Sequence, residues 1–352
     1  MEQANDEDDS LRIGDICRYY GIGALSAEAE QVFGGYLHQM WLIHTTSGRY
    51  ALKRLNPEIM ARPEARPNYL RSERVARAAA AAGIPAVLAI ALKNSPLADI
   101  AGSTYMLFEW IEGSMLSPSE RDDRHARTIG ELLERLHRLQ LPDMPSLSWK
   151  VYPQSHWEAL LERGSRCHMP WSQSFEARRQ SLLEWNKLFE DASMQLRHKA
   201  AVSHCDLNPR NVLWSSGGQP SIIDWESAGP THPTLELIDA ALSWSERDDG
   251  QIDRLAFMAV IEAYAKAGGE AHAPIEAAIY GRMGGMLDWL EYNMRRSMDT
   301  VIFGEDEQKL GAEQADFTFA SLQTLSANVP VWAEWAAQAF RNGILSRSEW
   351  IR

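Results

Sequence analysis

The chain has 352 residues, of which 45% are hydrophobic and 24% are charged, so it has enough apolar material for one large domain or two lobes. Its formal net charge of -13 argues against a nucleic-acid partner, because such a partner favours a basic surface. Three scattered cysteines argue against a disulfide framework and favour a reducing compartment.

The N-terminal end and the most apolar window bear on localisation. Residues 1–10 carry five acids and predict a disordered tail, without the basic and apolar regions of a secretory signal. The window 75–92 is interrupted by Arg77, Gly83 and Pro85, so we expect no membrane span. These features predict a cytoplasmic protein without a membrane partner.

A short helix is expected over 11–20, and residues 31–55 then have the pattern of a β-hairpin. Gly34 and Gly35 precede its first full strand. On the returning strand, side-chain alternation places Lys53 on the same face as two apolar residues. A lysine there needs an ion partner or a ligand, and the alternative is a Lys53 that reaches solvent from an edge strand.

The next helix is predicted over 67–82 from its alanine-rich composition. Glu73 is the only acid within this helix, and Glu64, just before it, is the other candidate for pairing with a buried cation. A surface pair of Glu73 with Arg77, one turn later, is the alternative. Two further strands are expected at 86–92 and 104–108, and the second continues into the segment 109–113.

From residue 117 onward the pattern is helical. Apolar positions at helical spacing predict a helix over 126–140, which carries His137. Further helices are expected over 157–164 and 175–198. The remainder, 251–352, predicts several amphipathic helices, with breaks at Gly269, Pro274 and Pro330.

The most informative stretch is 202–226, where two short apolar strands flank the turn Gly217-Gly218. Asp206 and Asn211 precede the first strand and Asp224 follows the second, so the hairpin brings these three side chains to one end of a sheet. Buried carboxylates are costly without a partner, and Asp and Asn oxygens suit Mg²⁺. The residues therefore predict a magnesium site.

This stretch resembles the catalytic segment of the aminoglycoside phosphotransferase and choline kinase family, which shares the protein-kinase fold. The family pattern is His-x-Asp, four residues, Asn, and a hairpin that ends in a hydrophobic residue and Asp; here it stands as His204-x-Asp206, Asn211 and Ile223-Asp224. The resemblance implies that Asp206 is the catalytic carboxylate and that Asn211 and Asp224 bind magnesium. Cys205 departs from the pattern, because the family often has Gly there.

The resemblance also implies which residues bind the nucleotide and the acceptor. The loop glycines cover the nucleotide, a lysine paired with a helix acid holds its phosphates, and the end of the last strand borders the adenine; these residues are Gly34, Gly35, Lys53, Glu73, Phe108, Glu109 and Ile111. The C-terminal helices build the acceptor site in this family, and the substrate candidates are Glu226, Asp288, Trp289, Glu291 and Tyr292. An amphipathic helix with a solvated face is the alternative for residues 287–298.

The implied fold is a bilobal α+β protein-kinase-like fold. A small antiparallel sheet with one helix forms the N-terminal nucleotide-binding lobe, 11–108, and the segment 109–113 is the hinge. The mainly helical lobe, 114–352, carries the catalytic hairpin. In this helical lobe the resemblance makes His137 structural and gives Glu236 or Asp239 as the acid that braces the catalytic loop.

The implied activity is transfer of the γ-phosphate of ATP or GTP, with Mg²⁺, to a hydroxyl group of a small molecule. Two acceptor classes remain open: an aminoglycoside-like antibiotic, and a metabolite such as an amino alcohol or a sugar. A nucleotide-binding pseudokinase that acts as a regulator is the alternative from a different class. The intact set of Lys53, Asp206, Asn211 and Asp224 argues against that alternative.

Overall fold

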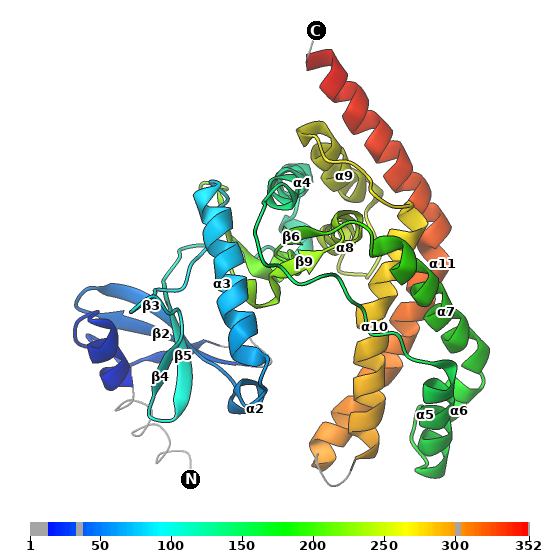
Figure 1. The fold of residues 1–352 in the computed structure, drawn as a ribbon, viewed down its shortest axis with the longest axis horizontal. Coiled ribbons are helices and arrows are strands. Elements are labelled where there is room, and N and C mark those ends of the chain that lie inside the picture. Colours follow the sequence, from blue (N-terminus) through cyan, green and yellow to red (C-terminus); the bar gives the residue numbers. More distant parts are fainter. Residues whose placement is uncertain (1–12, 33–37, 300–303, 351–352) are drawn as a thin grey trace. The chain divides into compact units, whose positions relative to one another are not determined.

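A computed structural model describes residues 13–32, 38–299 and 304–350, whose elements are shown in Figure 1. The chain divides into two compact units. The first comprises Met1–Ser117, Leu139–Asp143 and Val202–Gly229, and the second comprises Pro118–Arg138, Met144–Ala201 and Pro230–Arg352. The predicted catalytic stretch therefore lies in the same compact unit as the N-terminal strands.

The first unit is built on a five-stranded antiparallel sheet with the strand order β1-β2-β3-β5-β4. Its strands are β1 Glu30–Val32, β2 Gln39–Thr45, β3 Gly48–Arg54, β4 Ala98–Ile100 and β5 Ser103–Glu109. Strand β3 lies between β2 and β5, where Lys53 is opposite Met40 and Met106. Lys53 is therefore on a central strand, so it cannot reach solvent from an edge strand.

Apolar clusters cover both faces of this sheet. One face packs against the first helix, whose described part is 13–20, through a cluster that includes Ile16, Trp41, Leu52 and Leu107. The other face packs against α3 (Ala65–Ala81), the long helix beside the sheet in Figure 1, through Leu55, Tyr69 and Met106. Because opposite residues in a ladder share a face, Lys53 projects with Met106 toward the side of α3.

One strand prediction was wrong. Residues 86–92 do not form a continuous strand, although Ala89 makes an isolated bridge with Phe108 of β5. The segment divides its hydrogen bonds between two partners, since Ile90 N–H donates to the Leu107 carbonyl and Val87 N–H donates to the Ile222 carbonyl. The strand β4 lies instead at Ala98–Ile100, inside the predicted connecting loop.

The predicted hairpin of the catalytic stretch is present. Strand β7, Val212–Trp214, pairs with β8, Pro220–Ile222, in antiparallel register. Short 3-10 helices, η2 Pro209–Asn211 and η3 Trp225–Ser227, lie directly before and after the hairpin. The short helix α2, Pro57–Met60, also belongs to this unit. The strands β6, Ala201–Ser203, and β9, Gly229–Thr231, each include residues of both units.

The second unit is mainly helical. Its elements are η1 Pro118–Glu120, α4 Asp123–His137, α5 Gln154–Arg166, α6 Ser172–Glu176, α7 Arg179–Leu196, α8 Pro233–Ser245, α9 Arg254–Ala267, α10 Ile275–Met298 and α11 Glu305–Trp350. In Figure 1, α10 runs alongside α7 and α11, and α4 lies near α9. No helix within the described ranges is long and apolar enough to cross a membrane.

The C-terminal breaks are predicted only in part. Helix α9 ends at Gly268, which takes the left-handed conformation with φ of 113°, next to the expected break at Gly269. Pro330 was expected to end a helix, but α11 continues through it. Neighbouring apolar residues of α11, including Val329, Trp332 and Ala333, are buried, and their packing outweighs the backbone hydrogen bond that proline removes.

Candidate active site

Lys53 forms ion pairs with two carboxylates of the catalytic stretch. Its Nζ lies 3.0 Å from Asp224 Oδ1, and it also contacts Glu226 Oε1. Burial alone would lower the pKa of Lys53, whose side chain is 9% exposed, but the charges of Glu226 and Asp224 outweigh burial and raise it. Lys53 is therefore held as a cation beside the end of the hairpin.

Glu226 accepts hydrogen bonds from two other elements of the same unit. Its Oε2 lies 3.0 Å from His38 Nε2 and accepts a hydrogen bond from the Tyr69 hydroxyl at 3.3 Å. Burial acts to raise the pKa of Glu226, but the hydrogen bond from His38 and the charge of Lys53 outweigh it and lower the pKa to about 2. Glu226, a predicted substrate residue, thus lies in the network around Lys53.

Glu73, the predicted partner of Lys53, makes different contacts. Its Oε2 accepts a hydrogen bond from the Ala89 backbone N–H at 3.3 Å and lies 3.8 Å from Arg77 Nη2. Burial raises the pKa of Glu73, and Arg77, the Ala89 amide and Lys53 counteract this rise. Among the described residues, the ion pairs of Lys53 are therefore with Asp224 and Glu226, and the expected direct pair with Glu73 is not formed.

Asp206 and Asn211 are joined by hydrogen bonds. Asn211 Nδ2 donates to Asp206 Oδ2 at 2.8 Å and to the Asp206 carbonyl at 2.9 Å, while Asn208 Nδ2 donates to Oδ1 at 2.6 Å. Both hydrogen bonds of Asn211 Nδ2 go to oxygens of Asp206. This fixes which side of the Asn211 amide is the nitrogen, so Oδ1 lies on the side that points away from these two acceptors. The loop therefore orients the Asp206 carboxylate and leaves the side-chain oxygen of Asn211 available as an acceptor or ligand atom.

Asp224 and His204 fix the two ends of the catalytic stretch. Asp224 adopts a left-handed backbone with φ of 57° and ψ of 62°, a conformation that Asp tolerates better than most residues. His204 is fully buried, its Nε2 donates to the Ile223 carbonyl at 2.9 Å, and its ring packs edge-on against Trp225. His204 therefore supports the catalytic loop through a backbone hydrogen bond and ring packing.

Cys205 has a backbone conformation that explains the departure from the family pattern. Its φ is 62°, in the left-handed region that favours glycine. Its Sγ hydrogen bonds weakly to the Gly229 carbonyl at 3.4 Å. The chain thus holds a non-glycine residue in a strained conformation directly between His204 and Asp206.

The donor set of Asn211 and Asp224 fits magnesium. The described residues contain no group of three or more His, Cys, Asp and Glu side chains that would form a protein-only metal cage. Mg²⁺ needs few protein ligands, because phosphate oxygens and waters complete its shell. Asn211, just before the β7–β8 hairpin, can supply its amide oxygen, because its amide nitrogen is already bonded to Asp206. Asp224, just after the hairpin, can supply a carboxylate oxygen.

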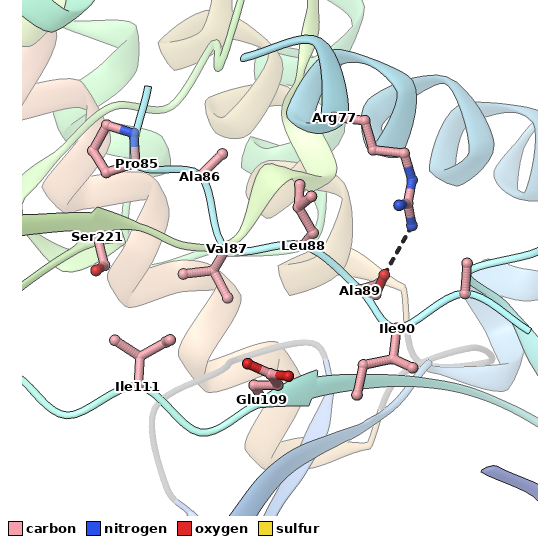
Figure 2. Close-up of a pocket in the computed structure, with 11 residues that line it drawn as sticks. Arg77, Pro85, Ala86, Val87, Leu88, Ala89, Ile90, Glu109, Ile111 and Ser221 are labelled. Carbon is pink, nitrogen blue, oxygen red and sulfur yellow. Dashed lines mark hydrogen bonds between the residues drawn. The ribbon is translucent and has the colours of Figure 1, made fainter. Parts of the chain in front are cut away.

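The predicted adenine-binding residues lie at the end of β5. Phe108 is half-buried against the cluster of Leu55 and Met106, and lies opposite Ala51. The Glu109 and Ile111 side chains line a pocket of about 530 Å³ with Val87, Ile90, Arg77 and Ser221, as Figure 2 shows. Lys53, Asp206 and Asp224 do not line this pocket, so it is separate from the charged cluster. Gly34 and Gly35 lie outside the described residues.

The predicted acceptor residues of α10 differ in their exposure. Trp289 and Tyr292 stack with ring centroids 5.5 Å apart and are 46% and 42% exposed. Burial raises the pKa of the Asp288 carboxyl, which shares a hydrogen bond with Tyr152. Glu291 is buried, and its Oε1 lies 3.1 Å from His156 Nε2.

His137 and Glu236 of the second unit form a buried pair. His137 Nε2 lies 3.0 Å from Glu236 Oε2, and its Nδ1 lies 2.9 Å from the Tyr264 hydroxyl. Both ring nitrogens of His137 are therefore engaged within the helical packing. The other predicted bracing acid, Asp239, pairs with Arg282 at 3.1 Å.

Sequence reasoning missed two residues of the charged cluster, His38 and Tyr69. Tyr69 lies one helical turn before Glu73, so the same helix face carries both. His38 precedes β2 by one residue, and alternation places it on the face of Met40, which is paired with Lys53. The helix face of Tyr69 and the strand face of His38 point to the Lys53 cluster only once the pairing of β2 with β3 is known, and the hydrophobic pattern alone does not give that pairing.

Comparisons with known proteins agree with this architecture. The model of the family described as "Phosphotransferase enzyme family" matches residues 28–278. A structure of spectinomycin phosphotransferase with ADP and spectinomycin is 13% identical, with a TM-score of 0.68, and the match covers 94% of this chain and 98% of that one. No curated protein matches the sequence.

Other solved structures share the fold at similarly low identity. An aminoglycoside phosphotransferase from Alicyclobacillus acidocaldarius is 18% identical, with a TM-score of 0.57 and coverage of 89% of this chain and 95% of that one. Choline kinase from Cryptosporidium parvum is 13% identical, with a TM-score of 0.56 and coverage of 90% and 95%. Together with the family match over most of its length, these similarities show that the chain has a protein-kinase-like α+β fold and belongs to the phosphotransferase enzyme family.

Proposed function

We propose that the protein is a cytoplasmic small-molecule kinase that transfers the γ-phosphate of ATP or GTP to a hydroxyl group. The observation that carries this proposal is the clustering, in one compact unit, of Lys53 with Asp224 and of Asn211 with Asp206. A phosphoryl transferase needs a cation for the phosphates, oxygen ligands for a metal and a carboxylate for the acceptor.

Asp206 takes the proton of the acceptor in this proposal. The hydroxyl oxygen forms a bond to the γ-phosphorus, the bond from that phosphorus to the bridging oxygen of the nucleotide diphosphate breaks, and the hydroxyl proton passes to Asp206. The amide donors of Asn208 and Asn211 orient the carboxylate for this role. Such positioned proton acceptors contribute roughly 10²–10⁴-fold to a rate.

Lys53 binds the nucleotide phosphates in this proposal, and Asn211 and Asp224 hold Mg²⁺. When bound, Mg²⁺ neutralises charge on the phosphate oxygens. Lys53 is suited to its role because neighbouring carboxylates keep it charged although it is buried. The backbone at Glu109 and Ile111 binds the adenine edge, and Phe108 packs behind the ring.

The acceptor in this proposal is a cationic hydroxyl compound. Trp289, which stacks on Tyr292 and is 46% exposed, offers an aromatic ring to a cation, and Asp288 offers a carboxylate next to it on the same helix. The Arg296 guanidinium already lies over the Tyr292 ring. Glu291 is already engaged with His156, so we assign it to support of this surface rather than to direct contact. Both amine-bearing antibiotics and amino alcohols fit this chemistry.

A nucleotide-consumption screen tests the proposed function. The purified protein with Mg²⁺ and either ATP or GTP is assayed against a mixed library of antibiotics and hydroxyl-bearing metabolites, and any product is checked for an added phosphate by mass spectrometry. We expect phosphate transfer to at least one cationic hydroxyl compound. Nucleotide binding without transfer to any member of the library would favour the regulatory pseudokinase instead.

A further inference from the structure

We infer that His38 is a positioning residue, which holds Glu226 against Lys53 and thereby fixes the lysine for nucleotide phosphate. The inference rests on the proposed function, because it concerns how Lys53 is prepared for a nucleotide. It departs from the sequence expectation, which gave this task to Glu73. The contacts of His38, of Glu226 and of Lys53 each support one step.

The first step is the tautomer of His38. The Asn56 backbone N–H donates to His38 Nδ1 at 3.0 Å, so Nδ1 is an acceptor and the ring proton is on Nε2. Nε2 then faces both Glu226 Oε2 and the Tyr69 hydroxyl oxygen, each at 3.0 Å, so its proton is shared between the carboxylate and the hydroxyl that is itself bonded to this carboxylate. Because the backbone N–H of Asn56, two residues after the end of β3, sets the tautomer, the imidazole presents its donor toward the carboxylate.

The second step is the fixed orientation of Glu226. Its Oε2 receives the His38 donor and the Tyr69 hydroxyl at 3.3 Å, which leaves Oε1 to face Lys53. The side chain of His38 is 5% exposed, so water competes little for its hydrogen bond. His38, just before β2, and Tyr69, on α3, thus hold the Glu226 carboxylate in one orientation.

The third step is the effect on Lys53. An ammonium group has three N–H donors, and Asp224 and Glu226 engage two of them. With respect to the residues that the structure describes, the third donor is left for a phosphate oxygen. Glu73 does not replace Glu226 in this role, because its carboxylate is engaged by Ala89 N–H and faces Arg77.

A double-mutant cycle on nucleotide affinity tests this assignment. The full-length protein, its His38→Leu and Glu226→Gln variants and the double variant are titrated calorimetrically with a non-hydrolysable ATP analogue and Mg²⁺. We expect His38→Leu to weaken binding by about tenfold, as the loss of a charge-assisted hydrogen bond does. In the Glu226→Gln protein, adding His38→Leu is expected to change the affinity by less than about twofold, because the histidine acts through that carboxylate.

Two further variants separate positioning from a general loss of structure. His38→Gln keeps an N–H donor at a similar reach and is expected to recover most of the lost affinity. His44→Leu is the matched control, because His44 is on β2 in the same unit, is half-buried and faces Glu30, away from Lys53 and Glu226. In steady-state kinetics, His38→Leu is expected to raise KM for ATP and to leave KM for the acceptor unchanged.

The outcomes distinguish this inference from the proposed function. If the unaltered protein binds no nucleotide, the proposed function itself fails. If it binds nucleotide but His38→Leu weakens binding equally with and without Glu226→Gln, His38 does not act through Glu226 and the inference is wrong. Should His38→Leu fail to fold, His38→Phe, which keeps an aromatic ring but removes both ring nitrogens, takes its place in the cycle with Glu226→Gln, and the same criterion decides.

Discussion

The ammonium nitrogen of Lys53 lies 3.0 Å from Oδ1 of Asp224, although 171 positions separate the two residues in the chain. This contact joins the central strand of the sheet to the residue that follows the β7–β8 hairpin. The cation that we propose for the nucleotide phosphates and the carboxylate that we propose for the metal are thereby held in one place.

Replacing Asp206 by alanine should remove turnover without removing nucleotide binding. The carboxylate is the proposed proton acceptor, so we expect the rate to fall by roughly 10²–10⁴-fold. The dissociation constant of a non-hydrolysable ATP analogue should change by less than about threefold, since Lys53 and Asp224 remain. The matched control is Asp99→Ala, because Asp99 pairs with Arg66 at an exposed position. Unchanged turnover in Asp206→Ala would remove this residue from the mechanism.

Replacing Asp224 by asparagine should raise the requirement for magnesium. The substitution keeps the shape and an oxygen that can accept from Lys53, but it removes the charge that attracts a divalent cation. We expect the Mg²⁺ concentration for half-maximal binding of the ATP analogue to rise by about tenfold or more. Calorimetry with increasing Mg²⁺ measures this, and chelation should abolish activity reversibly. An unaltered Mg²⁺ dependence, with Asp99→Asn as the control, would show that Asp224 is not a ligand.

Replacing Asp288 by asparagine should affect only the acceptor. If its carboxylate attracts a cationic substrate, KM for the acceptor should rise by about tenfold, while KM for ATP stays within about twofold. Glu276→Gln, at the start of the same helix, is the control for loss of a negative charge. Equal effects of the two variants would mean that Asp288 contributes only through the overall charge of the helix.

The sequence predicted the parts of the site that depend on local patterns. The β7–β8 hairpin was predicted because Gly217-Gly218 separates two apolar runs, and Lys53 was predicted because it interrupts an apolar strand face. The fold class followed from the resemblance that these motifs carry, and the family match confirmed it.

The partners of Lys53 could not be predicted in the same way. Glu226 meets Lys53 only because of the packing of distant segments, and no spacing rule gives that contact. Tyr69 and His38 complete the network from elements whose register is set by the whole sheet. The break expected at Pro330 was wrong for a related reason, since tertiary packing overrides a local propensity.

Replacing Cys205 by glycine should stabilise the protein. Cys205 has a φ of 62°, and a left-handed conformation costs a non-glycine residue about 1 kcal/mol or more. Cys205→Ala removes the same Sγ contact but keeps the strained backbone, so it is the matched control. We expect the melting temperature of Cys205→Gly to exceed that of Cys205→Ala, and Cys205→Val to be the least stable. The reverse order would show that strain at this position is not a cost.

His232 should make stability fall in mild acid. It precedes α8 and is 1% exposed, and neither ring nitrogen has a hydrogen-bond partner in the described part of the chain. Burial, with smaller contributions from the positive charges of His272, His137 and Lys199, lowers its pKa from 6.5 to about 4. Between these two values the unfolded chain binds the proton more readily than the native one, so stability is lost as the pH falls.

Replacing His232 by asparagine should remove this pH dependence, because asparagine does not titrate and is a good residue before a helix. The free energy of unfolding of His232→Asn minus that of the unaltered protein should be about 2 kcal/mol larger at pH 5 than at pH 7.5, because only the unaltered protein is destabilised in acid through this residue. Urea unfolding at both pH values measures this difference, in which the contributions of His137 and His272 cancel. His198→Asn, at an exposed position of the same unit, is the control. A constant difference across the two pH values would mean that His232 is protonated in the native protein.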